Sequence, residues 1–179
     1  MSGRVTLWNE AAVRDLTERL EDFRATCRPT TLVEVQHSSR SPFRLLVSCV
    51  ISLRTKDEVT HHASRRLLAL APDPADLAAL PETTIAEAIY PAGFYNTKAR
   101  QLRAIGQIIS DRHHGDVPGS EEELLDLPGV GRKTANLVLG LGFGTPAICV
   151  DTHVHRISNR LGLVATTSPD STERALENV

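Results

Sequence analysis

Two short motifs carry residue types that can do covalent chemistry. The first, LPGVGRKTA at 127–135, places Lys133 in the first turn of a predicted helix. The positive end of the helix dipole disfavours the ammonium form of such a lysine, and a free amine near neutral pH is a competent nucleophile. A solvated lysine that only contacts a phosphate is the alternative interpretation.

The second motif, ICVDTHVH at 148–155, places Asp151 at the head of another predicted helix, where it can serve as the N-cap. The helix from Gly131 to about Gly142 advances roughly 16 Å. The following residues 143–150 can span up to about 26 Å when extended, so the chain can return toward Lys133. A carboxylate that faces a lysine beside a phosphate-binding turn is an arrangement typical of a lyase.

The two glycines between these helices predict a tight turn with exposed backbone. Pro128 precedes Gly129 and Gly131, so the N–H groups of the turn face outward and no side chain keeps a phosphate away. Backbone contacts carry no base-sequence information, and the expected partner is therefore a nucleic-acid backbone. A helical hairpin that merely packs is the alternative. A dinucleotide-binding G-x-G motif is excluded because no strand precedes the turn.

The elements that must position these residues are predicted to be helices. Helical periodicity predicts nine or ten of them and no credible strand pair, so the fold class is all-α. The last helix is expected still to run at Val179, which makes the sequence look truncated. The expected N-caps are Asn9, Ser41, Thr55 (a capping box with Glu58), Asp73, Thr84, Asn96, Ser120, Asp151 and Ser168.

Composition agrees with a helical globular protein. The 179 residues are 41% hydrophobic and include few aromatic residues, so the core must be mostly Leu, Ala, Val and Ile. A net charge of −2 and a pI near 6.4 argue mildly against a nucleic-acid partner. A local basic face would suffice, and the chain offers Arg132, Lys133, Arg156 and Arg160. No signal sequence or membrane span is seen, so we expect a soluble, cytoplasmic, nucleoid-associated protein.

The sequence resembles the endonuclease III family of the HhH-GPD superfamily. The resemblance covers roughly residues 42–165, through LPGVGRKTANLVLG, VDTHVHRISNRLGL, LLVSCVISLRTKDEVT and GFYNTKARQL. It implies a two-lobed helical fold with a helix-hairpin-helix motif at about 120–142 and a DNA cleft between the lobes. A six-helix lobe would span 30–135, and a second lobe would combine 1–29 with 136–179.

The resemblance also implies an activity, that of a bifunctional DNA glycosylase and abasic-site lyase. The enzyme would act as a monomer on duplex DNA that contains abasic sites or damaged bases, and the expected damaged bases are oxidised pyrimidines. Lys133 would attack C1′ of the flipped-out nucleotide, expel the base and leave a Schiff base that undergoes β-elimination. Asp151 would assist deprotonation of the lysine and stabilise positive charge on the sugar.

Further residues are expected to contact DNA. Arg54 and Phe94 stand where many relatives carry glutamine and leucine to fill the space left by the flipped base. An arginine can bond the orphaned base and an aromatic ring can wedge between base steps, although Phe94 could also be an ordinary buried aromatic. The remaining expected DNA contacts are Asn96, Lys98, Leu127, Gly129, Val130, Gly131, Arg132 and Thr134.

Endonuclease III proteins usually end in four cysteines that hold a [4Fe–4S] cluster. None of the three cysteines here, Cys27, Cys49 and Cys149, lies beyond position 149. A cluster is therefore expected only if the natural protein continues past Val179, and residues 1–179 are expected to encode no cofactor and no metal site. The histidine pairs are expected in surface or capping roles.

Three other functions remain open from the sequence. A glycosylase of the same superfamily for another lesion, such as oxoguanine, would keep both Lys133 and Asp151. A non-catalytic helix-hairpin-helix module would bind DNA without cleaving it. A helical, metal-dependent phosphohydrolase built on the histidine pairs is a remote third alternative.

Overall fold

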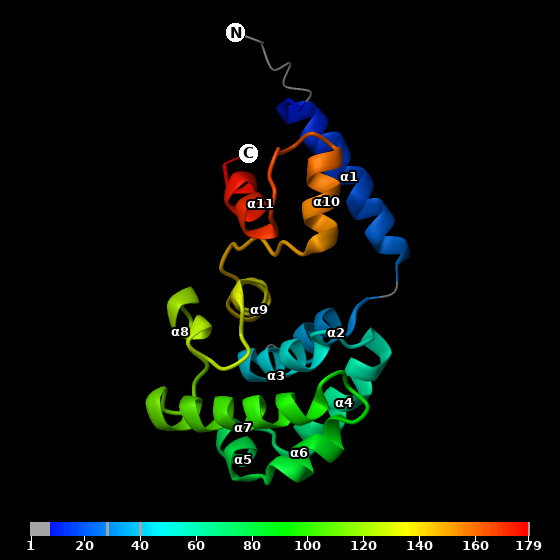
Figure 1. The fold of residues 1–179 in the computed structure, drawn as a ribbon. Helices are drawn as coiled ribbons and strands as arrows, with labels where there is room; N and C mark the ends of the chain where they lie inside the picture. The colour runs from blue at the N-terminus through cyan, green and yellow to red at the C-terminus, as the bar shows by residue number, and fades with distance from the viewer. Residues whose placement is uncertain (1–7, 28, 40, 179) are drawn as a thin grey trace. The chain divides into compact units, whose positions relative to one another are not determined.

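The computed structural model describes residues 8–27, 29–39 and 41–178, and every regular element in them is helical (Figure 1). The all-α prediction is therefore confirmed. The chain divides into two compact units: unit 1 combines residues 1–29 and 150–179, and unit 2 contains residues 30–149. The division falls after residue 149, whereas the sequence placed the lobe boundary after 135. The reason is that residues 132–143 pack against a central helix of unit 2.

Unit 2 is built around one buried, mostly apolar helix, α3. Its elements are α2 (Thr31–Ser39), α3 (Pro42–Ser52), α4 (Asp57–Leu70), α5 (Pro74–Ala79), α6 (Glu82–Ile89), α7 (Tyr95–Arg112), α8 (Glu121–Leu125), α9 (Arg132–Val138) and one π-helical turn, η1 (Leu139–Phe143). Helix α3 contacts α2, α4, α7, α9 and η1, while α5 and α6 pack on α7. Every residue of α3 from Leu45 to Ile51 is buried, so this part of the helix is covered on all sides.

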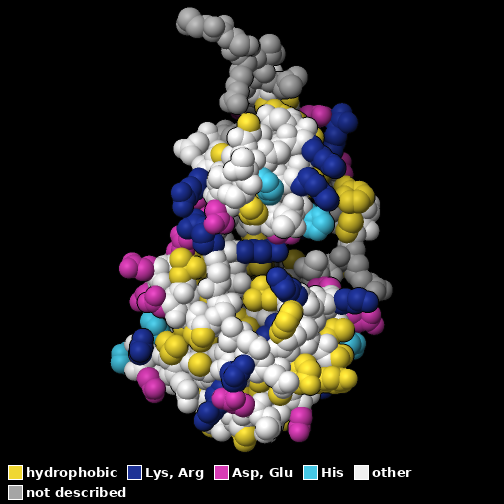
Figure 2. Space-filling model, in the orientation of Figure 1, with side chains coloured by type: hydrophobic (Ala, Val, Ile, Leu, Met, Phe, Trp, Pro, Cys, Tyr) yellow, Lys and Arg dark blue, Asp and Glu magenta, His cyan; other side chains and the backbone are white. Residues whose placement is uncertain are grey.

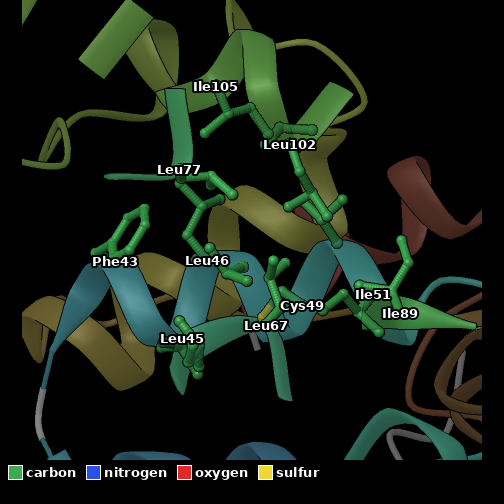
Figure 3. Packing of buried hydrophobic residues seen from close by; sticks show 14 of the residues in the cluster. Phe43, Leu45, Leu46, Cys49, Ile51, Leu67, Leu77, Ile89, Leu102 and Ile105 are labelled. Atoms are coloured by element: carbon green, nitrogen blue, oxygen red, sulfur yellow. The ribbon is translucent and has the colours of Figure 1, made fainter. Parts of the chain in front are cut away.

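The core of unit 2 is a single cluster of aliphatic side chains. Leu46 and Ile51 on α3 are completely buried, as are Leu77 on α5 and Leu102 on α7. In Figure 3, Leu46 points from α3 toward Leu77, with the α7 side chains on the far side of Leu77. Fully burying a leucine or isoleucine contributes about 1.5–3 kcal/mol, so this cluster fixes α3 and α7, the helices that carry the loops described below.

The N-caps of unit 2 divide into confirmed and corrected predictions. Ser41, Asp73 and Ser120 each accept a backbone N–H of the first turn, as predicted. The predictions for Thr55, Thr84 and Asn96 are wrong. Helices α4, α6 and α7 begin after Lys56, Pro81 and Phe94, and none of these three has a side-chain cap. Asn96 lies inside the first turn of α7.

Helix α2 was not predicted, and its N-terminus is held by a distant residue. The backbone N–H of Thr31 lies 3.2 Å from each carboxylate oxygen of Asp57, and the Thr31 hydroxyl donates to the Asp57 carbonyl at 3.1 Å. These bonds supply the acceptor that a local cap would normally provide. Helices α2 and α4 are thereby joined.

Unit 1 contains α1 (Glu10–Thr26), α10 (Thr152–Arg160) and α11 (Pro169–Leu176). The predicted N-caps Asn9, Asp151 and Ser168 are confirmed by side-chain bonds to the first turn of each helix. The indole N–H of Trp8 donates to the Leu161 carbonyl at 2.6 Å and ties the start of α1 to the end of α10. Helix α11 ends at Leu176, so the prediction that it still runs at the chain end is wrong; residue 179 itself lies outside the described residues.

Among the described residues, we find no helix with the length and apolar character needed to cross a membrane.

Candidate active site

The predicted hairpin is present, with α8 and α9 joined by a glycine turn. Gly129 adopts φ 81°, a left-handed conformation that favours glycine, and a Cβ atom there would lie 2.6–2.8 Å from the Gln101 side chain. Gly131 is the N-cap of α9, and a Cβ atom there would meet nothing within 4 Å. Gly129 therefore shapes the turn, whereas Gly131 leaves open space in front of the helix.

Several hairpin residues predicted to contact DNA are part of its support. Leu127, Val130 and Thr134 are buried, so their side chains anchor the hairpin in unit 2 and only their backbone remains for an outside partner. Arg132 forms a 2.9 Å ion pair with Glu121 at the start of α8. This pair joins the two hairpin helices and neutralises the arginine within the protein.

Lys133 is exposed in the first turn of α9, as predicted. The segment after η1 returns to this helix: the amide of buried Asn136 donates to the Ile148 carbonyl at 3.0 Å, and the Cys149 thiol lies 3.7 Å from the Lys133 carbonyl oxygen. The sequence predicted that residues 143–150 lead the chain back toward Lys133. Within unit 2 this is confirmed as far as Cys149, the last residue of that unit. These two bonds attach the returning segment to α9 beside Lys133.

Asp151 opens α10 in unit 1, and its carboxylate oxygen Oδ1 accepts the backbone N–H groups of His153 and Val154, both at 2.9 Å. The predicted capping role is confirmed. Lys133 belongs to unit 2 and Asp151 to unit 1, and each is described within its own unit. Their catalytic pairing stays a prediction.

Arg54 and Phe94 are brought together in unit 2. Phe94 is 64% exposed, which excludes the alternative of an ordinary buried aromatic, and the Arg54 guanidinium carbon lies 5.7 Å from the centre of its ring. Both residues have a left-handed backbone, with φ 52° for Arg54 and φ 57° for Phe94. Non-glycine residues rarely adopt this conformation, and such residues cluster at functional sites.

The motif GFYNTKARQL also contains Asn96 and Lys98, and one of these is exposed while the other is buried. Asn96 is exposed on α7, where a contact with DNA stays a prediction. Lys98 is only 4% exposed, and its ammonium group donates to Ile51, Leu53 and Thr55 inside unit 2. An outward contact between Lys98 and DNA does not fit this placement, because all three donors are used internally. The sequence predicted Lys98 as a DNA contact and Thr55 as an N-cap. It did not predict the internal hydrogen bonds that these two side chains make.

No group of three or more His, Cys, Asp or Glu side chains suited to a metal ion occurs among the residues that the structure describes. Cys27 is exposed, Cys49 is buried and Cys149 is half-buried, and none of the three takes part in a disulfide. These residues do not fit the four-thiolate site of a [4Fe–4S] cluster. His61 pairs with Glu34 at 3.1 Å, and His155 bonds Thr172 at 2.6 Å, so these two histidines have structural contacts.

Charge is distributed rather than concentrated on the visible face. Figure 2 shows Lys and Arg side chains in several separate groups, interspersed with Asp and Glu side chains. This agrees with the small net charge of −2. Contact with a polyanion would therefore depend on particular positions such as the hairpin, and less on the overall field of the protein.

An all-helical chain with a glycine-turn hairpin defines a helix-hairpin-helix protein. The family described as HhH-GPD superfamily base excision DNA repair protein matches residues 47–179. The match includes α9, most of α3, and the loops of Arg54 and Phe94. The chain is therefore a member of this superfamily.

Within the superfamily, the chain belongs to the endonuclease III family. It is 49% identical over 143 residues to endonuclease III of Thermotoga maritima, which covers 80% of this chain and 67% of that protein. It is 38% identical over 135 residues to endonuclease III of Bacillus subtilis, covering 75% of this chain and 61% of that protein. The chain thus spans about two thirds of the length of these bacterial relatives.

Solved structures agree with this assignment. A non-covalent complex of endonuclease III with DNA superposes with a TM-score of 0.82 at 32% identity, over 97% of this chain and 78% of that one. A trapped covalent intermediate of endonuclease III with DNA gives a TM-score of 0.82 over 97% of this chain and 79% of that one.

Proposed function

We propose that this protein is a base-excision repair enzyme that binds damaged duplex DNA, removes the damaged base and cleaves the resulting abasic strand. The observation that carries the proposal is the exposed Lys133 in the first turn of α9, two residues after the open backbone of Gly131. The sequence holds three lysines. Lys98 is buried and Lys56 precedes α4, so Lys133 is the lysine of the hairpin.

The reaction follows from an amine at this position. The Lys133 amine, in its neutral form, attacks C1′ of the damaged nucleotide, and the bond to the base breaks with its electron pair leaving on the base. Loss of the amine proton and ring opening give a Schiff base between Lys133 and C1′. Removal of a proton from C2′ then expels the 3′ phosphate, which cleaves the strand by β-elimination.

Asp151 supplies the carboxylate of this proposal. It accepts the proton of the Lys133 ammonium group and stabilises the positive charge that develops on the sugar in the transition state. The carboxylate oxygen Oδ1 accepts two N–H groups of the α10 backbone, and these bonds fix the orientation of the group. Capping and catalysis are compatible because a carboxylate has several lone pairs.

DNA docks through the hairpin and is distorted by the Arg54–Phe94 pair. Phosphate approaches the uncovered backbone at Gly131, a contact that does not depend on base sequence. The target base must leave the stack before C1′ can be reached. The exposed Phe94 ring enters the space of the flipped nucleotide, and Arg54 bonds the orphaned base.

The preferred substrates are oxidised pyrimidines, in keeping with the endonuclease III family, and the protein acts as a monomer on DNA in the cytoplasm. The test compares duplexes that carry thymine glycol, oxoguanine or an abasic site, each with and without borohydride. We expect excision of thymine glycol, strand cleavage at the abasic site and a covalent adduct when borohydride reduces the Schiff base. Preferential excision of oxoguanine would assign the enzyme to another lesion, and binding without cleavage would make it a non-catalytic module.

A further inference from the structure

A small polar cluster joins the loop of Arg54 to the turn of Phe94, and we name it the loop clamp. It consists of the Lys98 and Thr55 side chains, the carbonyls of Ile51 and Leu53, and the N–H of Gly93. The Lys98 ammonium nitrogen lies 2.6 Å from the Ile51 carbonyl oxygen, 2.6 Å from that of Leu53 and 2.9 Å from the Thr55 hydroxyl. An ammonium group has three N–H donors, so each has its own acceptor.

The Thr55 hydroxyl is the second half of the clamp. Its oxygen accepts the Lys98 ammonium, accepts the Gly93 N–H at 3.1 Å, and its proton is donated to the Leu53 carbonyl at 3.3 Å. A hydroxyl has one donor and two acceptor sites, and all three are in use. Lys98 on α7 is thus connected through Thr55 to both the α3–α4 loop and the α6–α7 turn.

The two backbones are also in direct contact. A Cβ atom on Gly93 would lie 2.4 Å from the Arg54 carbonyl oxygen, so only glycine permits this approach. On either side of the contact, Arg54 and Phe94 hold left-handed backbones. Such conformations are strained for residues other than glycine and persist only where the surrounding structure determines them. The loop clamp is the structure that surrounds this contact.

Lys98 itself is not placed to act as a nucleophile. Burial lowers the pKa of Lys98 to about 8, and a lowered pKa is a property that catalytic lysines share. Its nitrogen, however, is enclosed by two carbonyls and a hydroxyl in a side chain that is 4% exposed. A buried charge is retained only where its partners compensate the loss of water, and here those partners lie at the end of α3 and in the loop that presents Arg54.

We infer that Lys98 is a positioning residue, which holds Arg54 and Phe94 in the paired, outward conformation that enters duplex DNA. The inference rests on the proposed glycosylase function. Holding the two residues before DNA arrives removes the cost of ordering them during the reaction. Lys98 therefore acts on the distortion of the duplex and not on the chemistry at Lys133.

The experiment uses two independent substitutions in the clamp. Lys98→Met removes the three donors and keeps the aliphatic stem, while Thr55→Val removes the hydroxyl and keeps the shape. The matched controls are Thr55→Ser, which restores the hydroxyl, and Lys56→Met, which removes an exposed lysine from the same loop. If Lys98→Met does not fold, Thr55→Val and its serine partner still decide the question.

Three readouts separate positioning from chemistry. They are excision of thymine glycol from duplex DNA, borohydride trapping at a duplex abasic site, and the fluorescence of 2-aminopurine placed opposite the lesion, which rises when that base is unstacked. Both clamp variants should excise thymine glycol about tenfold or more slowly, because unstacking costs a few kcal/mol that the wedge helps to offset. Trapping at the abasic site, which is already unstacked, should stay within about threefold of wild type.

The 2-aminopurine signal should fall in both clamp variants and return in Thr55→Ser. Excision by the clamp variants at wild-type rates would overturn the inference. An equal loss of excision and trapping with an unchanged 2-aminopurine signal would overturn it as well, because the effect would then be one of stability alone. A wild-type protein that neither excises nor forms the adduct would instead remove the proposed function, and this inference with it.

Discussion

The guanidinium of Arg54 lies against the exposed ring of Phe94, 5.7 Å from its centre. A cation over an aromatic face at this distance contributes about 0.5–1 kcal/mol at an exposed site. This contact therefore favours the conformation in which the two side chains lie side by side. On the proposed function, we expect insertion into DNA to exchange this contact for contacts with bases.

Phe94→Ala should separate a role in DNA distortion from a role in folding. A buried Phe→Ala typically costs about 3–5 kcal/mol, whereas a change at an exposed side chain is usually within about 0.5 kcal/mol. Because Phe94 is 64% exposed, the melting temperature should hardly move. Excision from duplex DNA should slow, and cleavage at abasic sites should suffer less. A large drop in melting temperature with equal loss on both substrates would contradict the wedge.

Lys133→Ala should abolish the covalent adduct that borohydride traps during turnover, because no other lysine occupies the hairpin. Lys56→Ala is the matched control, since it also removes an exposed lysine. Gel electrophoresis of the reduced mixture measures the adduct. An undiminished adduct in Lys133→Ala, with an intact adduct in the control, would move the nucleophile elsewhere.

Asp151→Asn should keep the fold and lose the reaction. Asparagine caps helices about as well as aspartate, and the two backbone bonds to Oδ1 can be made by an amide oxygen. The melting temperature and DNA affinity should therefore stay close to wild type, while turnover falls by orders of magnitude. Near-normal single-turnover rates would reduce Asp151 to a helix cap.

Gly131→Val should weaken binding to damaged and undamaged duplex alike, because a side chain there stands in open space before α9 and blocks a phosphate. Gly119→Val is the control, at a position where a Cβ atom meets only the Phe143 ring at 3.6 Å. Fluorescence anisotropy with both duplexes measures the effect. Loss of affinity confined to damaged DNA would assign the hairpin to the lesion pocket.

The substitution Gly129→Val is less informative. Gly129 has φ 81° and a Cβ atom there would collide with the Gln101 side chain, so a valine would disturb the fold.

The buried Lys98 should change how the free energy of unfolding depends on pH. Burial lowers the pKa of Lys98 from 10.5 to about 8. Between these values the unfolded chain binds more protons than the folded chain, so the free energy of unfolding gains a contribution as pH rises from 8 to 10.5. Below pH 8 both states hold the proton, and the contribution is absent.

Cys49 acts in the opposite direction, because burial raises the pKa of its thiol from 9.0 to about 12. Its contribution is present below pH 9.0 and is lost as pH rises toward 12. The unfolding free energies of wild type and Lys98→Met are compared by chemical denaturation. The contribution of Cys49 is present in both proteins and cancels in their difference. The difference in unfolding free energy should move in favour of wild type between pH 8 and 10.5. A pH-independent difference would show that Lys98 is not buried as a cation.

Local patterns predicted the elements that they themselves determine. Asn9, Ser41, Asp151 and Ser168 cap the helices that they precede, because the cap acceptor and its N–H donors lie within three residues. The position of Lys133 at the start of a hairpin helix followed in the same way from the glycine turn.

The wrong or missing predictions concern residues whose partners lie far away in the sequence. Helix α2 was missed because the acceptor for its first N–H is Asp57, 26 residues away. Thr55 has the sequence of a capping residue, but its hydroxyl is taken by Lys98 and Gly93, which lie 43 and 38 residues further along the chain. Such competition between a local and a distant partner leaves no trace in the spacing of residues. The inward position of Lys98 was hidden for the same reason.

The bond between Trp8 and Leu161 has a spectroscopic consequence. Trp8 is the single tryptophan of the chain, and it is fixed within unit 1. Both tyrosines, Tyr90 and Tyr95, lie in unit 2, where their rings meet edge to face at 5.3 Å. Indole emission on selective excitation therefore reports the melting of one unit, and phenol emission reports the other. A single unlabelled sample thus distinguishes concerted unfolding from unfolding in two stages.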